Sequence, residues 1–145
     1  MVKDLVTDMA PFFKQWKRVR PAFRPVNDAA DFARIPPDSP RRDFIDQSMD
    51  CITCGACYSA CTLVAINDGF IGPAALNKAY TLIQDERDAD RVERLHVVAG
   101  ECGALRCHTL FNCAEVCPKG IVPTRAIQRL KQYAVRDALK PESHD

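Results

Sequence analysis

Apolar side chains recur every three or four residues in several stretches of the chain, which is the spacing of a helix with one buried face. In residues 1–20 the recurring apolar positions are Val6, Met9, Phe12, Phe13 and Trp16. Asp8 is a candidate N-cap, and Pro11 then falls in the first helical turn, where proline is tolerated. The pattern therefore predicts a helix over residues 1–20.

Three more helices are predicted towards the C-terminus. They run from Pro73 to about Asp88, from about 90 to 98 with an end near Gly100, and from Pro123 to about Leu139. Their apolar faces are Leu76, Ala79, Tyr80 and Ile83 in the first, and Ala126, Ile127, Leu130 and Ala134 in the last. Because few stretches alternate with a period of two, almost no sheet is expected and the fold class is all-α.

Prolines interrupt the helical pattern between residues 21 and 42. They are Pro21, Pro25, Pro36, Pro37 and Pro40, and five prolines cannot continue a helix. We expect an extended connector there, followed by a short helix over 43–50. The chain then divides into an N-terminal helix with a proline-rich docking connector, residues 1–42, and a helical domain, residues 43–145.

Two runs of cysteines indicate a metal protein. The first run is Cys51, Cys54, Cys57 and Cys61, and the second is Cys107, Cys113 and Cys117. The first run has the ferredoxin spacing C-x2-C-x2-C-x3-C, and a proline follows the last cysteine of the second run, as in ferredoxins. The second run keeps the same spacing, except that Leu110 stands where a cysteine is expected.

In ferredoxins with two clusters, the fourth cysteine of each run ligates the other cluster. One predicted ligand set is then Cys51, Cys54, Cys57 and Cys117, and the other is Cys61, Cys107 and Cys113. A cubane with one corner unliganded tends to lose that iron, so we predict one [4Fe–4S] and one [3Fe–4S] cluster, and hence electron transfer. A four-cysteine zinc site is the alternative, but four thiols within eleven residues favour iron–sulfur.

Three residues near the second run have two interpretations each. Cys102 is either a fourth ligand of the three-thiol centre or a buried small hydrophobe, and the inert interpretation is favoured. His108 either serves in hydrogen bonding and proton delivery beside a redox centre, which we favour, or is an ordinary histidine. Arg106 either raises the potential of that centre by its charge or forms an ordinary ion pair.

Charge and hydropathy exclude several classes of protein. The net charge is +1, from 20 basic and 19 acidic residues, so no nucleic-acid partner is expected. Basic residues gather within 14–24 and 125–136, either as solvated faces or as docking surfaces for a protein or for anionic lipid. No apolar run approaches the roughly 20 residues that cross a bilayer, and no signal peptide is visible. Cysteines in such a chain are expected to bind metal in a reducing compartment.

Several short segments around the cysteines carry a family resemblance. They are Asp4-Leu-Val-Thr-Asp-Met, Cys51-Ile-Thr-Cys-Gly-Ala-Cys, Phe70-Ile-Gly-Pro-Ala-Ala, Asp85-Glu-Arg-Asp, Arg106-Cys-His-Thr, Asn112-Cys and Cys117-Pro-Lys-Gly. With them the chain resembles the iron–sulfur subunit of succinate:quinone oxidoreductase (complex II) and of quinol:fumarate reductase. An apolar residue at position 110 is itself typical of this family.

The resemblance implies an α-helical ferredoxin domain that carries electrons from a flavoprotein, which holds FAD, towards ubiquinone or menaquinone. Succinate would be oxidised on the flavoprotein. The [3Fe–4S] centre would be the last donor, beside a quinone pocket that, carried over, comprises Thr62, Leu63, His108 and Leu110. Membrane anchor subunits would hold the chain peripherally at the mitochondrial inner membrane (matrix face) or the bacterial plasma membrane (cytoplasmic face).

The chain departs from this family in three respects. Thr62 replaces the usual proline, and no tryptophan follows within Val64-Ala-Ile-Asn, so the loop is closer in length to fumarate reductases. His108, in contrast, favours succinate dehydrogenase. No C-x4-C-x2-C motif for a [2Fe–2S] cluster precedes Cys51, so we expect the C-terminal half of a naturally split subunit, with the [2Fe–2S] domain on a separate chain. A free-standing soluble ferredoxin is the competing hypothesis, and a structural protein stapled by clusters is disfavoured by the missing ligand.

Overall fold

The computed structural model describes residues 6–26 and 37–139 of the 145-residue chain. The elements in these ranges are α1 (Ala10–Arg18), α2 (Pro40–Met49), α3 (Ala56–Ser59), α4 (Thr62–Ile66), α5 (Pro73–Gln84), α6 (Arg91–Ala99), the 3-10 helix η1 (Ala104–Arg106), α7 (Asn112–Glu115) and α8 (Pro123–Ala138). Among the described residues there is no strand, and Pro25 and Asp88 form one isolated antiparallel bridge. The all-α prediction is confirmed.

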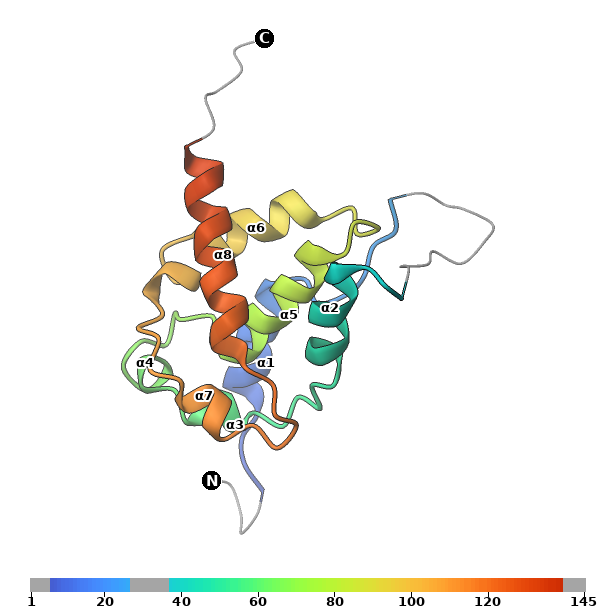
Figure 1. The fold of residues 1–145 in the computed structure, drawn as a ribbon. Coiled ribbons are helices and arrows are strands. Elements are labelled where there is room, and N and C mark those ends of the chain that lie inside the picture. Colours follow the sequence, from blue (N-terminus) through green and yellow to red (C-terminus); the bar gives the residue numbers. More distant parts are fainter. Residues whose placement is uncertain (1–5, 27–36, 140–145) are drawn as a thin grey trace.

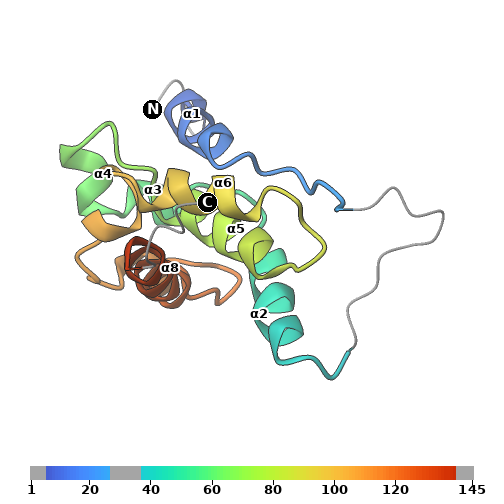
Figure 2. The same ribbon diagram turned by 90° about the horizontal axis from the view of Figure 1, so that it is seen from above.

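Helix α5 lies at the centre of the molecule. It packs against α8, α2, α6 and α1, and α1 and α8 lie on its opposite sides (Figures 1 and 2). Ten of its twelve residues are buried. The buried core cluster around it also includes Val19, Phe70, Val98, Ile127 and Leu130. Because α5 is packed on several sides, its own position is fixed. The loop that leads into α5 and the loop that leaves it are therefore held in place at the helix ends.

The predicted faces of the two long helices are confirmed. Leu76, Ala79, Tyr80 and Ile83 of α5 are at most 3% exposed, and Ala126, Ile127, Leu130 and Ala134 of α8 at most 6%. Both helices begin at a proline, as expected, because a first-turn residue needs no amide hydrogen. Helix α6 ends at Ala99 with Gly100 as its C-cap, which agrees with the prediction.

Three predicted helix bounds were wrong in detail. Within the described residues α1 begins at Ala10, not earlier, and the Asp8 carboxylate accepts a hydrogen bond from the Ala10 amide at 2.9 Å. Helix α5 ends at Gln84 because Asp85 folds back and accepts from the Arg87 amide, a side-chain turn that competes with the helix. Helix α2 begins at Pro40, three residues earlier than expected, since proline fits its first turn.

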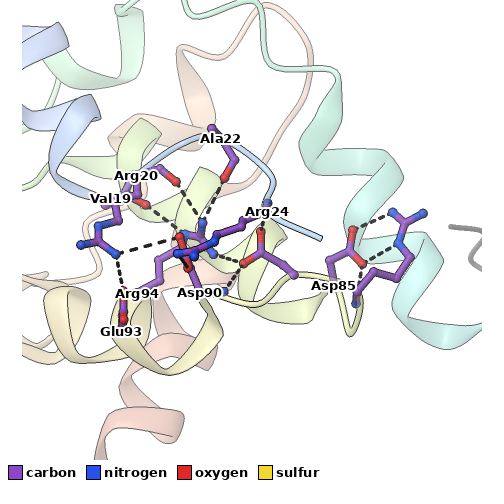
Figure 3. Close-up of polar contacts among 10 residues, drawn as sticks. Val19, Arg20, Ala22, Arg24, Asp85, Asp90, Glu93 and Arg94 are labelled. Carbon is purple, nitrogen blue, oxygen red and sulfur yellow. Dashed lines mark hydrogen bonds and ion pairs between the residues drawn. The ribbon is translucent and has the colours of Figure 1, made fainter. Parts of the chain in front are cut away.

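The buried Arg94 side chain ties α6 to the segment after α1 (Figure 3). Arg94 lies 2.5 Å from Asp88, and both side chains are inaccessible to solvent. The same guanidinium donates to the backbone carbonyls of Val19 and Arg20 at 3.0 Å and of Ala22 at 3.2 Å. The start of the predicted connector therefore lies against the helical domain, and residues 27–36 of that connector fall outside the described residues.

Candidate metal centres

The structure gathers four of the predicted ligands around one cavity. Cys51 and Cys54 lie in the loop before α3, Cys57 lies within α3, and Cys117 follows α7. All four line a cavity of about 320 Å³, together with Gly55, Ala74, Pro118, Lys119 and Ile121 among others. We call this the first centre. Its cysteines are the set predicted for the [4Fe–4S] cluster, and that ligand assignment stays a prediction.

The remaining three cysteines of the runs line a second cavity, of about 380 Å³. Cys61 immediately precedes α4, Cys107 follows η1, and Cys113 lies in α7. The residues predicted for a quinone pocket, Thr62, Leu63, His108 and Leu110, line the same cavity. We call this cavity the second centre. Leu110 is 56% exposed and Leu63 is 8% exposed, so the cavity has apolar side chains both at its surface and inside.

The two cysteine runs have related backbones. The residues two and four positions after the first cysteine adopt positive φ in both runs: Thr53 (53°) and Gly55 (78°) in one, Thr109 (62°) and Phe111 (63°) in the other. A four-residue helix follows at the same distance, and these helices, α3 and α7, lie side by side (Figure 1). This correspondence places Leu110 where the first run has Cys54.

Helix N-termini face both centres. Pro73, the first residue of α5, lines the second centre, and Ala74 lines the first. Thr124, in the first turn of α8, also lines the second centre. The N-terminus of a helix carries partial positive charge, which stabilises anions. Thiolate-ligated iron–sulfur groups are anionic, so the helix arrangement suits such groups.

The thiols of the first centre are close enough to disfavour one another's ionisation. The pKa of Cys57 is raised to about 12, first by burial and then by the nearby Cys51, Cys113, Cys54 and Cys117. A metal bound to such thiols removes their protons and neutralises the thiolates. In the described part of the chain no three His, Cys, Asp or Glu side chains converge on the position of a single ion. The donor chemistry and the ring of thiols around each cavity fit a cluster.

The two centres are neighbours. Cys113 of the second centre is among the groups that raise the pKa of Cys57 in the first, so their charges interact. Both cysteines lie in short helices that pack together, α3 and α7. An electron carrier at one centre is therefore close to a carrier at the other.

Polar groups surround the cysteines of the second centre. The Thr109 amide donates to Cys107 Sγ at 3.4 Å, and the Thr124 hydroxyl lies 3.2 Å from Cys113 Sγ. Lys131 Nζ donates to the Cys107 carbonyl at 2.6 Å. Burial raises the pKa of Cys113, and the hydrogen bond with Thr124 lowers it in part. Sequence reasoning missed Thr124 because only the packing of α8 on α7 brings it to Cys113.

The structure also shows where Arg106, Cys102 and His108 lie, the three residues that had two interpretations each. Arg106 donates to the Glu101 carbonyl and carboxylate at 3.0 and 2.7 Å, which is the ordinary ion pair. Cys102 packs against Gly69, where an added Cβ would lie 3.0 Å from its Sγ, and it lines neither centre. His108 is exposed at the rim of the second centre.

Comparison with known proteins agrees with these centres. Residues 47–121, which contain both cysteine runs, match the family model described as "4Fe-4S dicluster domain". The chain belongs to the 4Fe-4S dicluster domain family. It is also 36% identical over 139 residues to the succinate dehydrogenase iron-sulfur subunit of Coxiella burnetii. This confirms the resemblance inferred from the residues and supports an electron-transfer role.

The match to that relative covers 94% of this chain and 58% of the relative. The chain thus spans a little over half the length of the curated relative it matches. None of the helices in the described ranges is long and apolar enough to cross a membrane. The similarity of this 4Fe-4S dicluster protein therefore extends to only part of its relative.

Proposed function

We propose that this chain is the electron-transfer subunit of a succinate:quinone oxidoreductase (complex II of the respiratory chain and TCA cycle). Cys51, Cys54, Cys57 and Cys117 would hold a [4Fe–4S] cluster at the first centre. Cys61, Cys107 and Cys113 would hold a [3Fe–4S] cluster at the second. When bound, the clusters supply one-electron redox chemistry. The similarity to the Coxiella burnetii subunit supports this proposal.

One observation carries the proposal: seven cysteines divide between two neighbouring cavities as four and three, and Leu110 lines the second where a fourth thiol would be expected. Because Leu110 has no thiol, one corner of a cluster at the second centre would have no protein ligand. An apolar, partly exposed rim suits the approach of an apolar electron acceptor.

That acceptor would be a membrane quinone, ubiquinone or menaquinone. Leu63 and Leu110 would contact its ring, Thr62 would offer a hydroxyl, and His108 would donate a hydrogen bond or deliver a proton as the quinone is reduced. These four residues line one cavity with the three cysteines, which supports the assignment. The chain itself would take no part in succinate chemistry, which belongs to the flavoprotein and its FAD.

The remaining partners follow from the same proposal. A [2Fe–2S] centre would feed the first centre, and anchor subunits would hold the assembly peripherally at the mitochondrial inner or bacterial plasma membrane. A quinol:fumarate reductase is the second candidate, because the loop from Cys61 to Gly72 lacks tryptophan. The same centres would serve either direction of electron flow.

Low-temperature electron paramagnetic resonance of the air-oxidised chain tests the proposal. We expect the signal of an oxidised [3Fe–4S] centre, and a second, reducible centre that appears only after dithionite. Two reducible cubanes with no signal in the oxidised state would contradict the proposal and favour a soluble ferredoxin. Retention of quinone reduction by the assembled complex after His108→Ala would show that His108 delivers no proton.

A further inference from the structure

We propose that Thr124 is a positioning residue that tunes the reduction potential of the second centre. Its hydroxyl hydrogen-bonds Cys113 Sγ and so raises the reduction potential of the cluster that Cys113 holds. The inference rests on the proposed function, because it requires a cluster at Cys113. It concerns a residue outside both cysteine runs.

The contact is short and enclosed. Thr124 Oγ1 lies 3.2 Å from Cys113 Sγ, Thr124 is 1% exposed, and Cys113 is 8% exposed. Water therefore has little access to replace the hydroxyl as a donor. Thr124 follows Pro123 in the first turn of α8, and α8 packs on α7, which carries Cys113. Both partners are thus held on packed helices, and the hydroxyl is kept at the sulfur.

Ligation fixes the direction of this hydrogen bond. In the free thiol either atom can donate. A sulfur bound to iron has lost its proton, so the Thr124 O–H must then be the donor and Cys113 Sγ the acceptor. A donor to a ligand sulfur stabilises the state with more negative charge on that sulfur.

Reduction adds that negative charge. In the proposed function one electron leaves the first centre and enters the second, and part of its charge falls on the ligand sulfurs. The Thr124 hydrogen bond is then stronger in the reduced state than in the oxidised state. Its consequence is a higher reduction potential at the second centre, which favours electron flow from the first centre to the second.

The test is a dithionite titration of the full chain, purified anaerobically with its clusters, followed by electron paramagnetic resonance. Thr124→Val removes the hydroxyl and keeps the shape of the side chain. We expect reduction of the second centre to become about tenfold less favourable, a fall of about 59 mV for a one-electron couple. The potential of the first centre should not change. Thr124→Ser keeps the hydroxyl and should restore the original potential.

Thr81→Val is a matched control. Thr81 is also a buried threonine, 4% exposed, but its hydroxyl donates to the Asn77 carbonyl within α5, and it lines neither centre. Thr81→Val should leave the reduction potentials of both centres unchanged. Thr124→Ala, which adds no bulk, replaces Thr124→Val if the valine variant fails to hold its clusters.

Three outcomes would overturn the inference: an unchanged second potential in the variants without the hydroxyl, an equal shift of both centres, or no restoration by serine. These differ from failure of the proposed function. If the unmodified chain has no [3Fe–4S] signal, the cluster assignment fails before any variant is compared.

Discussion

At the scale of single residues, the proposed [3Fe–4S] cluster of the second centre depends on Leu110. The related backbones of the two runs place it where the first run has Cys54, and it lines the cavity with Cys61, Cys107 and Cys113. Leu110→Cys should therefore supply the fourth thiolate. We expect the [3Fe–4S] signal of the oxidised chain to disappear and a cubane of lower potential to replace it, as measured by electron paramagnetic resonance.

Leu110→Ala is the control for this change, because it removes the same apolar side chain without adding a ligand. It should keep the [3Fe–4S] signal. If Leu110→Cys gives the spectrum of the unmodified chain, then position 110 does not face the open corner and the alignment of the two runs is wrong.

Much of the site was predictable at this scale because ligand spacing is local. The division of seven cysteines into sets of four and three follows from spacing and the crossed pattern of ferredoxins, and the structure brings each set to one cavity. The contacts of Thr124 and Lys131 with the second centre were not predictable. They join residues 11 and 24 positions apart through helix packing, which no local pattern records.

At the scale of elements, Gly72 holds the start of α5 against the first cysteine run. Its φ is +85°, and an added Cβ would lie 2.7 Å from the Tyr58 ring. Gly120 has a similar φ of +66° but nothing within 4 Å. Gly120→Ala should cost about 1 kcal/mol of backbone strain. Gly72→Ala should cost about 1–3 kcal/mol more, from the clash and from a backbone conformation, φ 85° and ψ 159°, that is nearly confined to glycine.

Urea unfolding of the cluster-loaded variants, followed by circular dichroism, checks this difference through the midpoint concentration. Equal midpoints would contradict both the clash with the Tyr58 ring and the added backbone strain at Gly72. The first residues of α5 and α8 were predictable from the sequence, because each helix begins at a proline that precedes a helical repeat of apolar residues. The end of α5 was predicted too late, because the turn at Asp85 depends on side-chain hydrogen bonds with Arg87 that compete with the helix.

Arg94, which forms a buried ion pair with Asp88, joins α6 to the segment that follows α1 through backbone carbonyls. Arg94→Met would leave Asp88 as an unpaired buried charge and three carbonyls without their donor, so we expect a loss of about 3–5 kcal/mol in unfolding free energy. The matched control is Arg20→Ala. Arg20 pairs with Glu93 at the surface, and its loss should cost no more than about 1 kcal/mol.

Chemical denaturation measures the unfolding free energy of both variants, and a similar small loss for the two would contradict the role given to the buried pair.

This pair was missed in the sequence because nothing distinguishes Arg94 from the exposed Arg91 three residues earlier. Helical periodicity places a residue on a face, but only the folded chain shows that this face meets backbone carbonyls from residues 19–22.

At the scale of the whole molecule, the N-terminal end of α1 lies next to the first centre. Residues 7–9, Pro11 and Phe12 border a cavity of about 800 Å³ whose opposite wall includes Cys54, Gly55 and Tyr58. Cys54 is exposed, and so are the basic residues Lys14 and Lys17 further along α1. A partner that binds over α1 would therefore lie close to a ligand of the first centre, where electrons would enter the chain.

Charge reversal on α1 tests whether this surface receives the electron donor. If the donor is the flavoprotein, Lys14→Glu with Lys17→Glu should weaken its co-purification with the chain about tenfold, mainly through slower association at low salt. Arg125→Glu with Arg129→Glu, at exposed positions of α8 on the other side of α5, should leave co-purification intact. Because both double changes alter the net charge by the same amount, a difference between them reflects the place of the charge and not its amount. Loss of the partners with the α8 variant and not the α1 variant would assign the donor to α8, and the second centre would then be the point of electron entry.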